Sequence, residues 1–369
     1  MFYKRYIIIN SITGFLYFFV LISPFYASEN GVSLSDIGWV FTTVYAIQAV
    51  LSYTVGRFFE KFPPGIGVVV GRFIYSLGPL ILAFKYDLFW FAIAQIAASF
   101  FDVFFPSLVL YERAIIPSDI REEVYRKMIV TSESVKMFFL VFFVISYLRS
   151  FNIYRMLFLS MFFGSMVYIF AFLTFLPKVK SGMEGASRSH DRKSLLYIYI
   201  SQLLTFLSFN FASWMIVSYF LKEILKGDQL NMLYFEMFFS GSIILSYFLL
   251  GDKTKKIKLR WKFFIGGFLM SAYFFLMSIP SMETFYISHI LVGVGFLTWL
   301  PAKETLKFQS APKELGRWEG LFQGINIFSR IIFPPLSVMV ARSLSYSAVF
   351  IIGGILAFAG AVIALGVRE

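Results

Sequence analysis

Residues 156–176 read MLFLSMFFGSMVYIFAFLTFL, without a single Asp, Glu, Lys, Arg, His, Asn or Gln. Three similar stretches occur at 68–84, 263–280 and 346–366, and among these only the first holds a charged residue, Arg72. The four fall at every third hydrophobic segment, whereas each of the eight other segments carries a charged or amide side chain near mid-depth. Because a polar group that faces lipid is costly, we expect four spans to face lipid and eight to surround a polar interior.

The composition is that of a membrane protein. The chain is 59% hydrophobic and only 15% charged, whereas soluble domains average about 25% charged residues. A bilayer core of roughly 30 Å needs about 20 apolar residues per helix. We therefore predict an all-α polytopic membrane protein with twelve transmembrane helices, at 6–27, 37–59, 66–84, 88–110, 126–148, 155–176, 195–220, 230–250, 261–280, 283–302, 318–341 and 346–366.

The net charge of +12 is distributed unevenly between the two ends of these spans. The end with both termini collects 24 Lys and Arg residues, whereas the other end has six. The positive-inside rule makes the rich end cytoplasmic, in a multi-pass protein of the cell membrane. We interpret the excess as a topology signal and a contact with anionic lipid headgroups, and we expect no nucleic-acid partner.

Several chemistries find no support in the sequence. The chain has no cysteine and only two histidines, His190 and His289, so we expect no metal site. It has no nucleotide-binding loop and no hydrolase signature, so we expect neither an enzyme, nor a cofactor, nor transport driven by ATP on this chain.

The polar stretch at 177–194 is the one plausible internal boundary, and it separates residues 1–176 from 195–369. Pro106 and Pro117 lie eleven residues apart, as do Pro301 and Pro312. Charged residues near each pair match at an offset of 192 to 196. We therefore predict two six-helix bundles that arose by duplication, joined by a cytoplasmic linker.

The loops after the second and eighth spans carry the most recognisable motif. Gly56 is followed by Glu60-Lys61, and Asp252-Lys253 stands at the matching place in the second half. This pair resembles the signature of the major facilitator superfamily, although Phe62-Pro63-Pro64-Gly65 replaces the later glycine and arginines of the pattern. The loops before spans five and eleven also look like those of the family. The resemblance implies a cytoplasmic gate that holds the outward-facing state, at Gly56, Glu60, Lys61, Arg121, Asp252, Lys253 and Arg317.

Six ionisable residues lie well inside predicted spans, where a charge costs about 2.5–3.5 kcal/mol or more. In one interpretation they only neutralise each other, Asp102 or Glu133 with Lys136, and Glu236 with Arg330 or His289. In the other, Lys136 and Arg330 grip an anionic group in a central cavity, because an arginine fork matches a carboxylate or phosphate. The carboxylates then carry protons. The candidates for proton coupling or buried ion pairs are Asp102, Glu133, Glu236 and His289.

Uncharged polar residues complete the predicted substrate site. Most are amides, which also commonly bond between membrane helices without touching a substrate. The predicted substrate-binding set is Asn10, Gln48, Gln95, Lys136, Asn210, Trp214, Gln323, Asn326 and Arg330.

The resemblance implies secondary transport by alternating access. We expect a monomer in the lipid bilayer that moves a small polar or anionic solute, with protons as a candidate coupling ion. Two alternatives stay open: an exporter of amphipathic drugs or lipids, and a receptor or scaffold that transports nothing. The fifth span lacks the glycines of the family's drug antiporters, which argues against the first.

Overall fold

The computed structural model describes residues 2–59, 62–148, 153–179, 192–254, 256–310 and 315–368, and within these ranges every regular element is a helix. The first half of the chain forms α1 (Phe2–Asn10), α2 (Thr13–Glu29), α3 (Leu34–Phe59), α4 (Pro64–Leu82), α5 (Leu88–Val103), α6 (Phe105–Ile115), α7 (Arg121–Leu148) and α8 (Ile153–Phe175). The second half forms α9 (Arg192–Phe211), α10 (Trp214–Tyr219), the π-helix η1 (Phe220–Ile224), α11 (Gln229–Thr254), α12 (Leu259–Met277), α13 (Met282–Ser310), α14 (Leu315–Ser343) and α15 (Tyr346–Ala364).

Counted as continuous spans, these helices form the twelve predicted segments, three of which are broken near mid-depth. The breaks fall at Ser11–Ile12 in the first segment, at Phe104 in the fourth and at Ala212–Ser213 in the seventh. Irregular backbone at membrane depth is tolerated only where protein or water covers it. The three broken segments therefore face the interior of the bundle at these points.

Local sequence sets the helix starts at the end of the bundle opposite the termini. The Asp87 carboxylate accepts a hydrogen bond from the Trp90 N–H at 3.0 Å and caps α5, and the Ser345 hydroxyl caps α15 in the same way. Gly31 adopts a φ of +84° in the turn between α2 and α3, a conformation that side chains with a Cβ rarely adopt.

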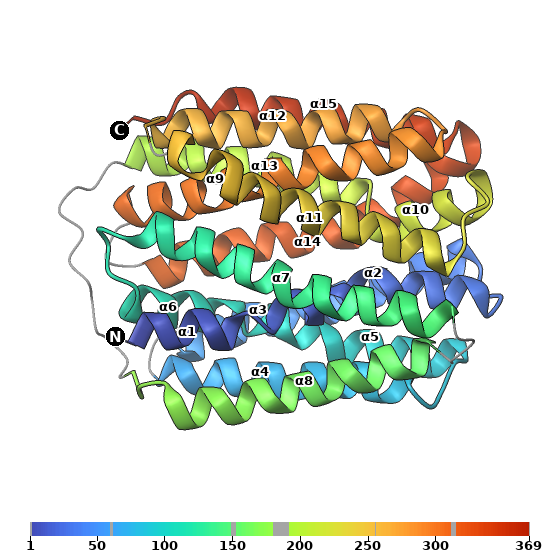
Figure 1. Ribbon diagram of the computed structural model, residues 1–369, viewed down its shortest axis with the longest axis horizontal. Coiled ribbons are helices and arrows are strands. Elements are labelled where there is room, and N and C mark those ends of the chain that lie inside the picture. The colour runs from blue at the N-terminus through green and yellow to red at the C-terminus, as the bar shows by residue number, and fades with distance from the viewer. Residues whose placement is uncertain are drawn as a thin grey trace.

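The four least polar segments occupy the outer edges of the molecule, as the sequence predicts. α4 and α8 lie along one edge and α12 and α15 along the opposite edge (Figure 1). Each of these four packs mainly within its own half of the chain. The two halves meet through α3 with α14, α7 with α11 and α13, and α2 with α10. Both termini lie at one end, which we call the terminal end, and we call the opposite end the far end.

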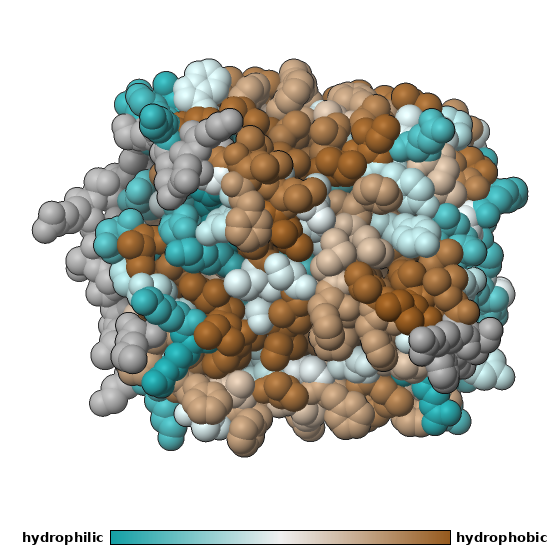
Figure 2. Space-filling view, viewed as in Figure 1, coloured by the Kyte–Doolittle hydropathy of each residue, from teal (hydrophilic) through white to brown (hydrophobic). Residues whose placement is uncertain are grey.

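On the face that Figure 2 shows, apolar side chains cover most of the middle of the bundle, and hydrophilic residues gather toward its two ends. Among the described residues, eleven helical stretches are long and apolar enough to cross a membrane. The one predicted segment outside that set is the ninth along the chain, α12. Its first turn carries Arg260 and Lys262. This pattern is that of a multi-pass membrane protein.

Most predicted boundaries agree with the helices to within a few residues, and the tenth span shows the largest difference. The sequence predicts its end at residue 302 and a charged loop over 303–317, whereas α13 continues to Ser310. Lys303, Glu304 and Lys307 thus belong to a helix and are buried. Residues 180–191 of the predicted linker lie outside the described residues, and the division into two bundles stays a prediction.

Candidate functional site

An ion pair joins the two halves near mid-depth. Nη1 of Arg330, near the middle of α14, lies 2.6 Å from Oδ2 of Asp102, which precedes the break between α5 and α6. The two side chains keep 24% and 39% of their surface exposed. The Arg330 guanidinium lies 5.5 Å from the centre of the Tyr45 ring on α3, and its Nε has no hydrogen-bond partner among the described residues. The pair is therefore partly exposed, while the unpartnered Nε of Arg330 is itself buried.

A polar cluster lies on α14 within a turn of Arg330. The Asn210 amide, near the end of α9, donates to Oδ1 of Asn326 at 2.9 Å and to the Ser329 hydroxyl at 2.8 Å. Gln323 lies seven residues before Arg330, which places it on the same face of α14, and it is half-buried. We define the central site by these residues together with the ion pair: Asp102, Asn210, Gln323, Asn326, Ser329 and Arg330.

A second set of charges joins the halves between α7 and α11. Nζ of Lys136 lies 2.7 Å from Oε2 of Glu133 and 2.7 Å from Oε2 of Glu236, and the Ser240 hydroxyl donates to Glu133 at 2.7 Å. All three charged side chains are at most 9% exposed. We call Glu133, Lys136 and Glu236 the buried triad. Because these charged side chains are buried and bound to one another, the triad is a poor candidate for direct contact with a solute.

Of the predicted pairings, that of Glu133 with Lys136 is present, and the others are revised. Asp102 pairs with Arg330 and not with Lys136, and Glu236 pairs with Lys136 and not with Arg330 or His289. His289 is fully buried among Phe235, Tyr273 and Phe285, and its Nδ1 lies 2.7 Å from the Phe285 carbonyl oxygen. Sequence alone could not choose among these partners, because each helix can present the same residue to several neighbours.

Among the described residues, no hydrogen bond joins Asn10, Gln48, Gln95 or Trp214 to the residues of the central site. The Gln48 amide donates to the Ser99 carbonyl oxygen at 3.4 Å, and the Gln95 amide donates to the Ser23 hydroxyl at 2.8 Å. Both bonds join helices of the first half. Trp214 stacks against Phe235 with ring centres 6.4 Å apart, and Asn10 ends α1. Bonding between helices describes these amides better than a shared substrate surface does.

Only one of the predicted gate residues has described side-chain contacts. Nη2 of Arg121 donates to the Ile116 carbonyl oxygen at 3.0 Å, and the guanidinium lies 4.3 Å from the centre of the Phe308 ring in the other half. Glu60 and Lys61 lie outside the described residues, as do the side chains of Asp252, Lys253 and Arg317, and the surroundings of Gly56.

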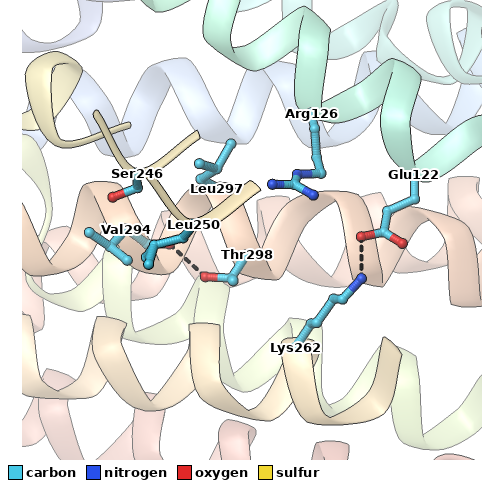
Figure 3. Close-up of a pocket in the computed structure, with 8 residues that line it drawn as sticks. All are labelled: Glu122, Arg126, Ser246, Leu250, Lys262, Val294, Leu297 and Thr298. Carbon is cyan, nitrogen blue, oxygen red and sulfur yellow. Dashed lines mark hydrogen bonds and ion pairs between the residues drawn. The ribbon is translucent and has the colours of Figure 1, made fainter. Parts of the chain in front are cut away.

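The terminal end holds further contacts between the halves that sequence reasoning assigned to loop charge. Nζ of Lys262 on α12 lies 2.6 Å from Oε1 of Glu122 on α7, and Arg126 donates to the Gly251 carbonyl oxygen at 3.2 Å. Figure 3 shows Glu122, Arg126 and Lys262 around a cavity of about 20 Å³, enough for roughly one water molecule. These contacts close the interface between α7 and the second half at this end.

Two buried polar networks flank this closure, one in each half. In the second half, Lys303, Glu304, Lys307 and Glu319 form ion pairs of 2.6 to 2.9 Å. In the first half, the carboxylate of Glu112 accepts hydrogen bonds from the hydroxyls of Tyr6 and Tyr125. The sequence could have indicated the network of the second half, because residues three or four apart share a helix face and 303, 304 and 307 have this spacing.

The halves also touch at the far end. The Tyr219 hydroxyl donates to the Val32 carbonyl oxygen at 2.5 Å, Lys222 donates to the Ser28 carbonyl oxygen, and the Gln229 amide donates to Glu29 at 2.9 Å. The halves are thus in contact at both ends and in the middle. Among the described residues, no group of three or more His, Cys, Asp or Glu is placed to hold a metal ion.

Comparisons with known proteins agree with this architecture. Residues 198–369 match the sequence model of the Major Facilitator Superfamily. No curated protein matches the chain by sequence. The whole fold is similar to three solved structures, each at low sequence identity. A bacterial homologue of the iron transporter ferroportin in an outward-facing state shares 12% identity, with a TM-score of 0.68 over 99% of this chain and 97% of that one.

The other two are the human organic anion transporter MFSD10, at 10% identity and a TM-score of 0.72 over 98% of both chains, and the transporter FucP in its outward conformation, at 12% identity and a TM-score of 0.68 over the full length of both. At these identities the likeness concerns the fold alone. The sequence of the second half is thus similar to the Major Facilitator Superfamily, and the twelve-segment fold of the whole chain is similar to that of solved transporters.

Proposed function

We propose that the protein is a secondary transporter that moves a small polar or anionic solute across the cell membrane by alternating access. One observation carries the proposal: Arg330 stands near mid-depth between the halves, part-exposed, with an unpartnered Nε. A cation at this depth is costly and persists where it pairs with other groups or lines a water-filled path. The fork of an arginine suits a carboxylate or phosphate.

In this mechanism the solute and Asp102 compete for the same guanidinium. An anionic solute that enters the central site takes the place of the Asp102 carboxylate on Arg330. A proton then neutralises the released carboxylate, which couples solute binding to proton binding. The amides of Asn210 and Asn326 supply hydrogen bonds beside the charge.

Alternating access requires the halves to separate at one end while they stay joined at the other. Contacts suited to this role lie at both ends: Glu122 with Lys262 at the terminal end, and Tyr219 with Val32 at the far end. We propose that residues 1–176 and 195–369 move as two bundles in a monomer, with both termini cytoplasmic as the charge bias favours. Arg121 and the other predicted gate residues would form the cytoplasmic latch.

The test is uptake into proteoliposomes of the purified protein, with panels of carboxylates, organic phosphates, sugars and amphipathic dyes, at several values of pH. We expect one anionic class to be transported by the native protein. Arg330→Gln should reduce that uptake by about a hundredfold or more, because a bidentate, charge-assisted contact is lost. Asp102→Asn should keep binding and lose the pH dependence.

The matched control is Arg342→Gln, which removes a second arginine of α14 from an exposed pair with Glu223 at the far end. It should transport normally. Uptake by Arg330→Gln at the native rate would overturn the anion-binding role. Transport of dyes but of no polar solute would favour the exporter, and no transport in any panel would favour the receptor or scaffold.

A further inference from the structure

A second cavity lies in the first half at the far end, away from the central site. It has a volume of about 490 Å³ and is formed by the ends of α2, α4 and α8. Ligand sites for small molecules typically measure about 300–1,000 Å³. None of its lining residues belongs to the central site, to the buried triad or to the predicted gate. The cavity therefore requires an explanation of its own.

The walls of the cavity carry one negative and one positive group among aromatic rings. Glu29 and Arg155 supply the charges, and the rings of Tyr26 and Tyr154 lie 4.6 Å apart beside them. The Arg155 guanidinium lies 4.9 Å from the centre of the Phe84 ring. A carboxylate and tyrosine faces attract an ammonium group, and a guanidinium fork suits a phosphate. The lining thus fits a ligand with both charges.

One oxygen of Glu29 remains available for such a ligand. The Tyr154 hydroxyl and the Gln229 amide both donate to Oε2 of Glu29. Among the described residues no hydrogen bond to Oε1 is found, and Glu29 is exposed. A primary ammonium, with three donors, can bond to Oε1 without displacing either partner.

The position of the cavity indicates the depth of its occupant. It lies where the outermost helices α4 and α8 reach the far end. The next residues along the chain include Phe84, Tyr86 and Phe89, which are 56%, 64% and 66% exposed. Aromatic side chains of this kind gather at the level of the lipid headgroups. The cavity thus lies at the membrane surface, next to the contact that Glu29 makes with the other half.

We propose that this cavity binds a zwitterion composed of a phosphate and a primary ammonium, the chemistry of the phosphatidylethanolamine headgroup. The phosphate lies against Arg155 and the ammonium against Glu29. Glu29 also accepts the Gln229 amide of the other half, and Lys222 of that half binds the Ser28 carbonyl oxygen next to it. The proposed ammonium site thus adjoins two contacts between the halves at the far end.

The experiment measures binding to the purified full-length protein in detergent by native mass spectrometry. Four probes are compared: phosphatidylethanolamine, phosphatidylcholine and phosphatidylglycerol with identical acyl chains, and soluble phosphoethanolamine. We expect phosphatidylethanolamine to bind most tightly among the lipids, because the choline group has no N–H and glycerol has no positive charge. Glu29→Gln and Arg155→Gln should each weaken its binding roughly tenfold, the loss of about 1.4 kcal/mol.

The matched controls are Glu283→Gln and Lys85→Gln, which remove like charges at the far end outside the cavity lining. Both should bind as the native protein does. Competition by soluble phosphoethanolamine would identify a free zwitterion as the occupant, and its absence would identify the lipid. Equal binding of the three lipids, or native affinity in both cavity variants, would overturn the proposal. Thermal unfolding without lipid verifies that each variant is folded, and no step of the test depends on transport.

Discussion

Two of the sets of ion pairs between the halves, the buried triad and the Asp102–Arg330 pair, have nearly the same bond lengths but different surroundings. Lys136 lies 2.7 Å from two carboxylates, and Arg330 lies 2.6 Å from one. The buried triad is at most 9% exposed, whereas the side chains of Asp102 and Arg330 keep 39% and 24% of their surface. The bond lengths do not distinguish the two sets. The difference in burial indicates a structural role for the buried triad and a role in solute binding for Asp102 and Arg330.

The physical reason is the cost of a charge that loses its partner. Removing one member of a buried pair leaves an uncompensated charge in a medium of low dielectric constant. Removing one member of an accessible pair leaves a charge that water can solvate. The effects of substitution on stability should therefore follow burial, while the effects on transport should follow access to the solute.

The largest effect on stability is expected at the buried triad. Lys136→Met leaves Glu133 and Glu236 together without a cation, and should lower the free energy of unfolding by about 3–5 kcal/mol. Denaturant unfolding in detergent, followed by tryptophan fluorescence, measures the loss. The triple variant that adds Glu133→Gln and Glu236→Gln should recover most of it. Native stability in the single variant would show that neither Glu133 nor Glu236 carries a charge once Lys136 is removed.

A smaller effect is expected at the terminal end, where Lys262 is 5% exposed and its partner Glu122 is 26% exposed. Lys262→Met should cost about 1–2 kcal/mol, because a hydrogen bond to a charged group is lost beside a side chain that water reaches. The same unfolding measurement applies, with Lys127→Met as a control in an exposed pair on α7. If Lys262→Met lowered the free energy of unfolding as much as Lys136→Met, burial would not determine how much each variant is destabilised.

At the central site the cost should be lower still. Arg330→Gln should lower the free energy of unfolding by less than about 1 kcal/mol, since water solvates the Asp102 carboxylate that remains. Its effect on uptake should nevertheless exceed that of every other variant discussed. A fall in stability that accounts for the loss of uptake would place Arg330 with the buried triad as a structural residue.

The smallest effect is expected at Arg342, which is 52% exposed and pairs with Glu223 at 3.1 Å. Arg342→Gln should change the free energy of unfolding by no more than about 0.5 kcal/mol, as is usual for exposed substitutions. Uptake should stay native. A clear loss of uptake would extend the functional surface of α14 to the far end.

The sequence predicted the fold well because its main signal is thermodynamic and local. A segment such as 156–176 can lie in lipid, and a segment that holds Asp102 or Arg330 cannot face it, whatever its neighbours are. The spacing of such segments therefore predicted the twelve segments and the outer positions of α4, α8, α12 and α15. The end of α13 was placed too early because Lys303, Glu304 and Lys307 read as loop charges, although they neutralise each other inside the bundle.

The candidate site was only partly predictable. Sequence singled out Arg330, Asp102, Asn210 and Asn326. It also placed Gln48, Gln95 and Trp214 in the same set, although their described contacts are with other residues. The Glu122–Lys262 pair and the cavity beside Glu29 gave no signal, because their residues come from separate loops and helix ends. Such juxtapositions depend on how helices pack, which no local pattern encodes.

The amino-acid sequence by itself determined the solvent of each segment: transfer free energies add residue by residue, so composition is enough to assign a span to lipid or to the interior. Only the tertiary structure decided which charge meets which. The energy of an ion pair depends on separation and on burial, and both are set by the packing of helices that lie a hundred or more residues apart in the chain. That is why Lys136 and Arg330, matched in the sequence as one cation per half, stand in two different environments.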